Sequence, residues 1–555
     1  MMDRSIAPHL KGATNIKYKY SRTSGNMRSL LFLLCVLLVQ RQGFSLSFGA
    51  AAKQTADDAD DASEQVEISW SEPDAADGSA AVPVSASVRG AAKHVANEDF
   101  ATGSIFETFF ASSASDADVS SALKETIRQM ANDDYIKTFL RETRRSLHRH
   151  PDVMYQEDFA SRTIQAVLAE LDIPFSTGWA KNTHEDVYPG KGGYGVVAHI
   201  GKREAVGPCI ILRADMDALP ILEATKDIDG FKSENAGKMH ACGHDGHVTM
   251  LLGAAALLKK IEDQITVGTI RLVFQPAEEG GAGMKRMVEE GVVSMEPRAQ
   301  EAYGLHVWPT LPTGTVASRP GPLLAASETF EIRIEGKGGH AAMPHLTIDP
   351  IVTASALVSN LQTLISRTIS PLESGVISVT QISAGDAFNV IPASAMLRGT
   401  IRALSTDMLV ALKGKVEGMV RSTASLYGCN STIRFSPDFY PPTVNDEGLF
   451  QWSKNVGALV SREDNLRDIE PTMGGEDFAF LAQEVPSTFF LVGQGSGGRD
   501  NEKYHVPRTD FGLHHPSFAL DENVLPIGAE LHVNLALRSL KRLSQDGEEL
   551  VKAEL

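Results

Sequence analysis

Hydrophobic positions between residues 133 and 322 alternate between helical and strand-like spacing. Segments 135–150 and 158–173 carry apolar residues three and four positions apart, which predicts two amphipathic helices. Residues 247–265 form a longer apolar helix. Four short β-rich runs accompany these helices, at 194–200, 209–214, 269–275 and 301–307. Strands separated by helices of this length predict an α/β fold with a mostly parallel sheet and helices on both faces.

The pattern changes beyond this region. Residues 330–336 and 396–403 alternate apolar and polar positions, as half-buried antiparallel strands do, and helical segments lie between and after them. We therefore expect a smaller inserted α+β domain at 323–435. It would interrupt a main domain whose two parts are 131–322 and 436–545.

The first 44 residues have the pattern of a targeting segment. A basic leader precedes an apolar run at 29–39, which is short for a bilayer span and typical of the core of a signal peptide. A signal anchor and an organelle transit peptide are the alternatives. The tail 546–555 ends in Lys-Ala-Glu-Leu, one substitution from the KDEL retrieval signal, and Asn430 opens a glycosylation sequon. We expect the endoplasmic reticulum lumen or secretory pathway, with a plastid as the alternative, and no membrane contact beyond an N-terminal anchor.

Composition separates residues 45–130 from the rest of the chain. Between 51 and 120, fourteen Asp or Glu face three Lys or Arg, and Ala and Ser are frequent. Too little apolar surface is available there to offset the entropy of ordering, which predicts an acidic disordered extension. The net charge of −18 argues against nucleic-acid binding, but most of it comes from this segment. It therefore says little about what the folded part binds.

Chemically capable side chains follow the predicted strands. They are Asp215 and Asp217 after 209–214, Glu278 and Glu279 after 269–275, His306 near the end of 301–307, and the stretch "HACGHDGH" at 240–247. In parallel sheets ligands gather at the carboxyl ends of strands, so we expect these groups to meet. Histidine, cysteine and carboxylate together are typical metal ligands.

These motifs resemble a known family, the dimetal amidohydrolases and carboxypeptidases related to aminoacylase. The most similar branch contains hippurate hydrolase and the plant hydrolases of indole-3-acetic acid–amino acid conjugates. The motifs that carry the resemblance run in the family's order from about residue 135 to 545: "LHRHPDVMYQE", "LRADMDALPI", "MHACGHDGH", "VFQPAEEGGAGMKRMVEEGV", "GLHVWP", "GKGGHAAMPH", "NVIP", "MGGEDFAF" and "LHHPSFALDENVLPIGAELH". The resemblance implies a catalytic domain and an inserted lid that often dimerises.

The resemblance also implies a metal centre with two divalent ions. Cys242 would bridge them, His244 and His306 would complete the first site, and Glu279 and His514 the second. Manganese is the first expectation for the metal, with zinc, cobalt and nickel as alternatives, since thiolate, imidazole and carboxylate suit these ions.

Catalytic roles follow from the same resemblance. Glu278 would act as general base, taking a proton from water and passing it to the leaving amine. Asp217 would orient a metal-binding histidine in much of the family. Here, however, Asp215 stands where that histidine is usually found, which leaves a contact of Asp217 with other groups, or a purely structural role, as alternatives.

Three residues of the inserted domain match substrate-contacting positions of the family. His340 would stabilise the oxyanion of the tetrahedral intermediate, and Asn389 and Arg402 would bind the substrate's free carboxylate. A homodimer through the inserted domain is left open.

The leading hypothesis is a metal-dependent amidohydrolase that cleaves small-molecule N-acyl-amino acids, with indole-3-acetic acid–amino acid conjugates as the first candidates. Jasmonoyl or hippurate-like substrates and a dipeptide carboxypeptidase activity are alternative readings. The non-enzymatic alternative is a conjugate-binding protein that has lost the chemistry, against which the presence of Glu278 argues.

Overall fold

The computed structural model describes residues 15–21, 45–49, 63–71, 82–98, 104–112, 117–202, 207–226, 228, 230–495, 509 and 511–554. The chain divides into two compact units, Met1–Pro83 and Val84–Leu555. The first unit contains an antiparallel sheet of strand order β1-β3-β2, formed by β1 (Asn15–Ser21), β2 (Ser45–Gly49) and β3 (Ser63–Ser71). Everything below concerns the second unit.

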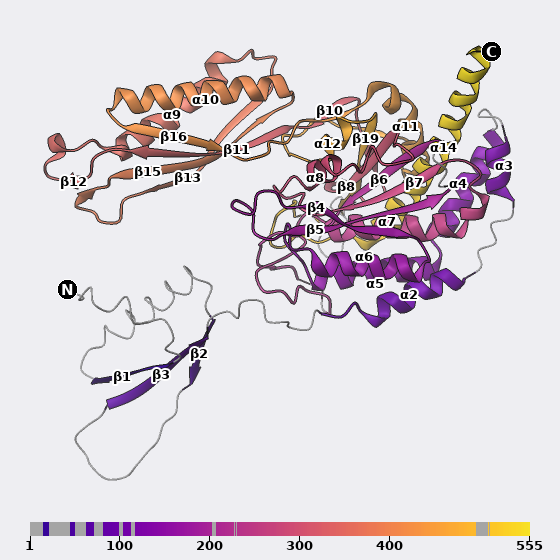
Figure 1. The fold of residues 1–555 in the computed structure, drawn as a ribbon, viewed down its shortest axis with the longest axis horizontal. Helices are drawn as coiled ribbons and strands as arrows, with labels where there is room; N and C mark the ends of the chain where they lie inside the picture. The colour runs from indigo at the N-terminus through magenta and orange to yellow at the C-terminus, as the bar shows by residue number, and fades with distance from the viewer. Residues whose placement is uncertain are drawn as a thin grey trace, which may run out of the picture. The chain divides into compact units, whose positions relative to one another are not determined.

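An eight-stranded sheet organises the main domain, with strand order β18-β9-β19-β8-β6-β7-β5-β4 (Figure 1). Its strands are β4 (Phe175–Lys181), β5 (Gly192–Gly201), β6 (Cys209–Asp215), β7 (Thr269–Gln275), β8 (Glu301–Pro312), β9 (Val316–Ser318), β18 (Arg467–Asp468) and β19 (Ser487–Gly495). The central pairs β7–β6, β6–β8 and β8–β19 are parallel, whereas β4–β5, β5–β7 and β9–β19 are antiparallel.

Both faces of this sheet are buried, because alternate residues of each central strand enter different cores. In β6, Ile210 and Leu212 belong to the core under the long helices, while Cys209 and Ile211 belong to the core on the opposite face. The main-domain helices are α5 (Asp134–Arg149), α6 (Asp158–Glu170), α7 (His244–Lys260), α8 (Gly283–Glu289), α11 (Glu447–Val460), α12 (Phe478–Ala482) and α14 (Leu525–Glu554). The helix α7 is buried along nearly all of its length, as expected for a helix that is apolar on every side.

The inserted domain is an antiparallel sheet of strand order β13-β15-β11-β16. Its elements are β11 (Ala326–Glu335), α9 (Pro350–Thr368), β13 (Gly375–Ala384), β15 (Ser394–Ala403), α10 (Thr406–Leu426) and β16 (Asn430–Phe435). The helices α9 and α10 lie together on one face of the sheet (Figure 1), where they bury Leu357, Leu361, Leu412 and Val416. A parallel-rich main sheet and a smaller α+β insert confirm the predicted fold class.

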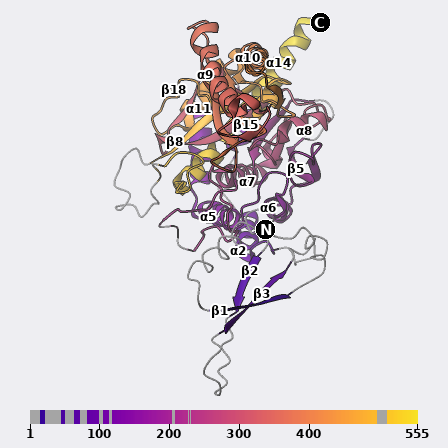
Figure 2. The same cartoon turned by 90° about the vertical axis from the view of Figure 1, so that its left-hand side faces the viewer.

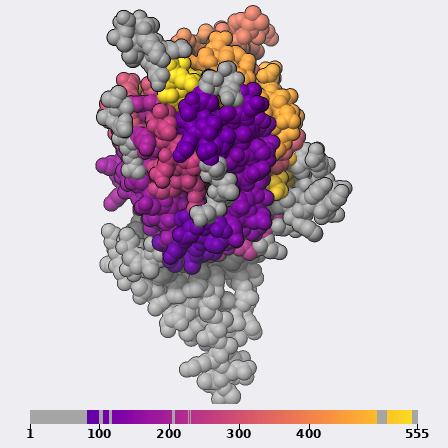
Figure 3. Space-filling view, turned by 90° about the vertical axis from the view of Figure 1, so that its right-hand side faces the viewer, coloured from indigo at the N-terminus to yellow at the C-terminus, as the bar shows by residue number. Residues whose placement is uncertain are grey.

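The described residues between 84 and 131 differ from the predicted disorder. They form α2 (Ala86–Asn97), α3 (Ile105–Ala111) and α4 (Ala117–Ala131), whose apolar faces join the main core. The helices α2, α5 and α6 lie on the same side of α7 (Figure 2), and in Figure 3 the indigo residues of this segment cover part of one face, beside the yellow α14. The average composition of 51–120 concealed these short amphipathic stretches.

None of the helices in the described part of the chain combines the length and the hydropathy needed to cross a bilayer. The apolar run 29–39, on which the predicted signal segment depends, lies outside the described residues.

Candidate metal centre and active site

Neighbouring strands bring the predicted polar clusters to one edge of the large sheet. Asp215 ends β6 and Gln275 ends β7, and the two residues are partners in the parallel register. The chain leaves these strands through Asp217 and through Glu278 respectively, so the two acidic clusters lie side by side as expected. The expected end of the next strand at 307 is wrong, because β8 continues to Pro312 and carries His306 within it.

The start of α7 approaches β8 closely. Gly243 has a φ of +90°, and a Cβ on this residue would lie 2.5 Å from Cγ2 of Val307. A side chain at this position would therefore force the two elements apart. The glycine lets Cys242 and His244, on either side of it, face His306.

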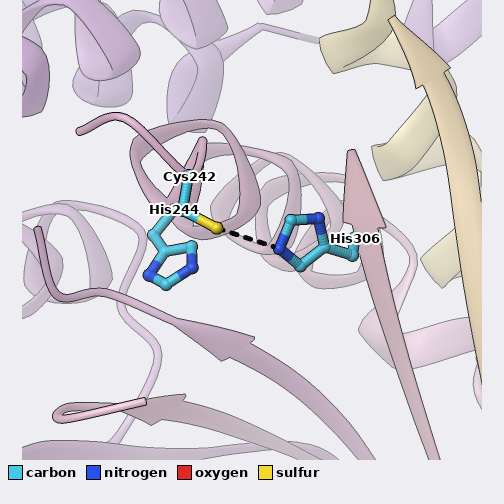
Figure 4. Close-up of side chains that lie close together, drawn as sticks. All are labelled: Cys242, His244 and His306. Carbon is cyan, nitrogen blue, oxygen red and sulfur yellow. Dashed lines mark hydrogen bonds between the residues drawn. The ribbon is translucent and has the colours of Figure 1, made fainter. Parts of the chain in front are cut away.

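Two groups of metal-binding side chains share Cys242. The first is Cys242, His244 and His306, and the second is Cys242, Glu279 and His514, with the ligand atoms of each group within 4.8 Å of one another. Figure 4 shows the Cys242 sulfur pointing at the His306 ring, 3.4 Å from Nε2, with the His244 ring beside it. In the second group, Nε2 of His514 lies 3.2 Å from Oε1 of Glu279.

Hydrogen bonds leave the inward-facing histidine nitrogens free to bind a cation. Nδ1 of His306 lies 2.7 Å from the carbonyl oxygen of Val307, which can only accept, so Nδ1 carries the proton and Nε2 keeps its lone pair. Both ring nitrogens of His244 are buried without a hydrogen bond to any described residue, and Oε1 of Glu279 has the ion pair with His514 but no hydrogen bond among the described residues. Buried polar atoms are normally paired, so these donor atoms fit a pair of divalent metal ions held around one sulfur.

The charges at this centre also fit cations. Burial raises the pKa of the Cys242 thiol well above its ordinary value, and Glu279 and Glu278 raise it further. A thiolate here therefore needs positive charge beside it. Burial, followed by the charges of Glu476 and Glu279, likewise raises the pKa of Glu278. A carboxylate with a raised pKa is suited to taking up a proton and releasing it.

Asp217 contacts three parts of the centre at once. Its carboxylate accepts hydrogen bonds from the backbone amides of Glu278, at 3.0 Å, and Glu279, at 2.9 Å. Its Oδ1 also lies 3.3 Å from Nδ1 of His244. This geometry suits an orienting role toward His244, although Asp215 has replaced the usual histidine.

Asp215 has both oxygens engaged elsewhere. Oδ1 lies 2.6 Å from Nδ1 of His247, whose Nε2 accepts a hydrogen bond from the amide of Val307, so Nδ1 is the protonated nitrogen. Oδ2 accepts from Arg213 at 2.8 Å. Asp215 is thus occupied in fixing the ring of His247 and the side chain of Arg213.

A buried arginine behind the site was missed by the sequence reasoning. Arg213 is almost fully buried, and its guanidinium donates to Asp215, Gln275 and Asp477 and pairs with Glu476. The signal was a charged residue inside the apolar strand "CIILRAD". A buried charge requires such partners, which predicts a network but not its members.

The predicted substrate residues of the inserted domain are divided between its two ends. Arg402 is the register partner of Ser327 at the beginning of β11, and its Nη1 would lie 3.0 Å from a Cβ on Gly475 of the main domain. Glu278 is close enough to raise the pKa of Arg402, although burial lowers it by more. Arg402 therefore lies at the end of the inserted domain that faces the metal centre.

His340 and Asn389 lie at the other end. The short strands β12 (Gly339–His340) and β14 (Val390–Ile391) pair there, and the amide of Ala341 donates to the carbonyl of Asn389. Since β11 has ten residues, its two ends are about 30 Å apart. The structure brings these two residues next to each other, but not next to the metal centre.

Comparisons with known proteins find a family match and several similar proteins. The model of peptidase family M20/M25/M40 matches residues 211–538. The chain is similar to the IAA-amino acid hydrolase ILR1-like 4 of Arabidopsis thaliana, with 43% identity over 72% of this chain and 85% of the relative. It is similar to the N-acetylcysteine deacetylase of Bacillus subtilis, with 36% identity over 74% of this chain and 99% of the relative. Among solved structures it resembles a dinuclear metal-binding peptidase of the M20 family from Bacillus subtilis, with a TM-score of 0.57, 32% identity, and coverage of 74% of this chain and 99% of that one.

Proposed function

Because the chain belongs to peptidase family M20/M25/M40, we propose that it is a metal-dependent amidohydrolase that cleaves N-acyl-amino acids into an acid and a free amino acid. The observation that carries the proposal is the sharing of Cys242 between two ligand groups, with the buried Glu278 beside them. The relatives whose names specify an acyl-amino acid substrate support this reaction class.

Each residue of the site has a task in this reaction. Two divalent ions held by Cys242, His244, His306, Glu279 and His514 would polarise the scissile carbonyl and lower the pKa of a water molecule. Glu278 takes a proton from the attacking water as the water oxygen bonds to the acyl carbon, and delivers that proton to the amine nitrogen as the amide C–N bond breaks. Asp217 holds the backbone amides of Glu278 and Glu279 in place. Arg402 binds the substrate carboxylate through two parallel N–H donors.

Hydrolysis by the purified protein, with Glu278→Gln as control, tests the proposal. The wild type should release free amino acid from acyl-amino acids, and Glu278→Gln should lose about 10²–10⁴ in kcat while it keeps its metal. Equal product from both proteins would remove Glu278 from the mechanism. Release of no amino acid from any acyl-amino acid would favour the conjugate-binding alternative.

For the substrate and the metal we propose indole-3-acetic acid–amino acid conjugates and manganese. The similarity to an Arabidopsis IAA-amino acid hydrolase supports the first choice. A panel of indoleacetyl, jasmonoyl, benzoyl and acetyl amino acids, together with free dipeptides, separates this activity from the other acyl specificities and from a carboxypeptidase. Repeating the panel with manganese, zinc, cobalt and nickel ranks the metals.

A homodimer through the inserted domain would explain the position of His340. Large apolar side chains are exposed around its end of the sheet, on α9, on the edge strand β13 and on the segment that follows it: Ile351, Val352, Ile382, Phe388 and Val390. An exposed group of this kind is typical of an interaction site. We propose that a second copy covers it and that His340 serves the metal centre of that copy. Mixing His340→Ala with Glu278→Gln should then restore activity, whereas two inactive proteins that stay inactive would refute the exchange.

For localisation we propose the endoplasmic reticulum, on the strength of the leader, the KDEL-like tail and the sequon. Imaging of a protein tagged between the leader and the main domain, with the C-terminus free, tests this against the plastid.

A further inference from the structure

The loop that carries Glu278 has an unusual backbone. Ala277 has a φ of +58°, Gly280 of +99° and Ala282 of +56°, all in the left-handed region that non-glycine residues rarely adopt. Such a conformation persists only when the surrounding structure holds it. The loop makes one backbone hydrogen bond within itself, from the amide of Gly280 to the carbonyl of Glu278, and its Ala277 carbonyl accepts from Gly283 at the start of α8. Because the loop is neither helix nor strand, its other polar backbone groups must find partners among side chains.

Four side chains supply most of these partners. Asp217 accepts from the amides of Glu278 and Glu279, Glu157 accepts from Ala277, and the Tyr155 hydroxyl donates to the carbonyl of Gly281. These three come from the first part of the main domain. The fourth, Tyr440, follows the inserted domain in the chain.

Tyr440 makes three hydrogen bonds to this loop. Its hydroxyl donates to the carbonyl oxygen of Glu278 at 2.7 Å and accepts from the amides of Gly280 at 3.0 Å and Ala282 at 2.9 Å. One donor and two acceptor sites are the full capacity of a hydroxyl group. The residue is buried, so few water molecules can take over these bonds.

The backbone of Tyr440 is tied to the inserted domain. Its amide donates to the carbonyl of Ser327 and its carbonyl accepts from the amide of Ser327, both at 2.8 Å. Ser327 is in turn the register partner of Arg402. One residue therefore contacts both the strand beside Arg402 and the loop that carries Glu278.

We propose that Tyr440 is a positioning residue, which holds Glu278 in place relative to the paired strands β11 and β15, the second of which carries Arg402. This rests on the proposed function, in which Glu278 is the base. Tyr440 itself reaches only the backbone of the loop. Its ring contributes packing against Phe480, with the ring centroids 5.9 Å apart, and phenylalanine would preserve that packing. Tyr440→Phe thus removes the hydroxyl alone.

A matched control is available at Tyr303. Its hydroxyl is also buried and makes two hydrogen bonds, to Glu301 at 2.8 Å and to Ser539 at 2.6 Å. Neither partner belongs to the 277–282 loop. Tyr303→Phe therefore loses a buried hydroxyl in the same chain without disturbing the base.

The test combines steady-state kinetics, metal analysis and hydrogen–deuterium exchange on the full-length, metal-loaded protein. Tyr440→Phe should lower kcat about 10- to 100-fold, leave KM within about threefold, and keep the wild-type metal content. Amides of 279–283 should exchange at least about tenfold faster. Tyr303→Phe should leave both the kinetics and this exchange unchanged.

Unchanged kcat in Tyr440→Phe would overturn the proposal, as would wild-type protection of the 279–283 amides. An equal fall of kcat in both variants would also overturn it, because the effect would then be a general loss of stability. A wild-type protein that hydrolyses no acyl-amino acid would remove the proposed function instead, and the exchange would still decide whether Tyr440 holds the loop.

Discussion

Asp217→Asn is the substitution whose effect the structure specifies most closely. The carboxylate accepts from the amides of Glu278 and Glu279 and lies 3.3 Å from Nδ1 of His244. An asparagine keeps one acceptor oxygen and places an NH₂ group against one of these donors. A buried donor without an acceptor costs about 1–3 kcal/mol, which is a factor of roughly 5–150. Misorientation of a metal-binding histidine typically costs a further 10–100-fold in metal affinity or activity.

We therefore expect Asp217→Asn to lower kcat/KM by about 10²–10³ and to require a higher metal concentration for half-maximal activity. The assay is hydrolysis across a titration of the metal. Asp349→Asn is the matched control, because this carboxylate also accepts from two successive amides, those of Ile351 and Val352, but at the exposed start of α9. Asparagine serves there almost as well. Wild-type activity and metal dependence in Asp217→Asn would show that the carboxylate of Asp217 does not position Glu278 or His244.

Three further predictions address the pocket, the core and the metal. Gly475→Ala should raise KM about tenfold for substrates with a free carboxylate, and much less for their methyl esters, because its Cβ would lie 2.9 Å from Cβ of Ser327 and 3.0 Å from Nη1 of Arg402; equal effects on both substrates would contradict this. Burial lowers the pKa of His532 to about 3, whereas a histidine in the unfolded chain has a pKa of about 6.5. As the pH falls below about 6.5, the unfolded chain therefore takes up a proton on His532 that the folded chain does not. The free energy of unfolding should fall by about 2 kcal/mol between pH 7 and pH 5 for this reason. Chemical denaturation at both pH values should show a smaller fall in the free energy of unfolding for His532→Leu than for the wild type. An equal fall in both proteins would contradict this assignment to His532. Cys242→Ser should lose metal and activity together, since oxygen is a poorer bridge than sulfur for these ions; full metal occupancy with unchanged turnover would contradict that.

The parts of the fold that were predicted correctly depend on strong periodic signals. The strands at 209–214 and 269–275 are long apolar runs, and so is the helix predicted at 247–265, which runs from His244 to Lys260 in the structure. Their order specifies a parallel sheet whose carboxyl edge collects the polar residues. The order of strands and helices alone therefore predicted that Asp217 and Glu278 lie at the same edge of the sheet. His514 could be assigned to the metal centre only through the family resemblance, because this residue lies on a loop far along the chain from the other ligands.

Other features depended on long-range contacts that periodicity does not encode. The amphipathic faces of α2, α3 and α4 are short and lie within an acidic segment, so composition outweighed them. Partners of the buried Arg213 come from β7 and from the residues before α12, and only the folded sheet brings them together. The hydrogen bonds from Tyr440 to the loop of Glu278 could not be predicted either, because an isolated tyrosine in a loop has no periodic pattern.

We propose that one sulfur, Sγ of Cys242, holds two metal ions beside the base Glu278. Anomalous diffraction at the metal edge, from crystals of the metal-loaded protein, measures this directly. We expect two peaks, each about 2.3 Å from Sγ of Cys242, one reached by His244 and His306 and the other by Glu279 and His514. A single peak, or two peaks away from Cys242, would contradict it.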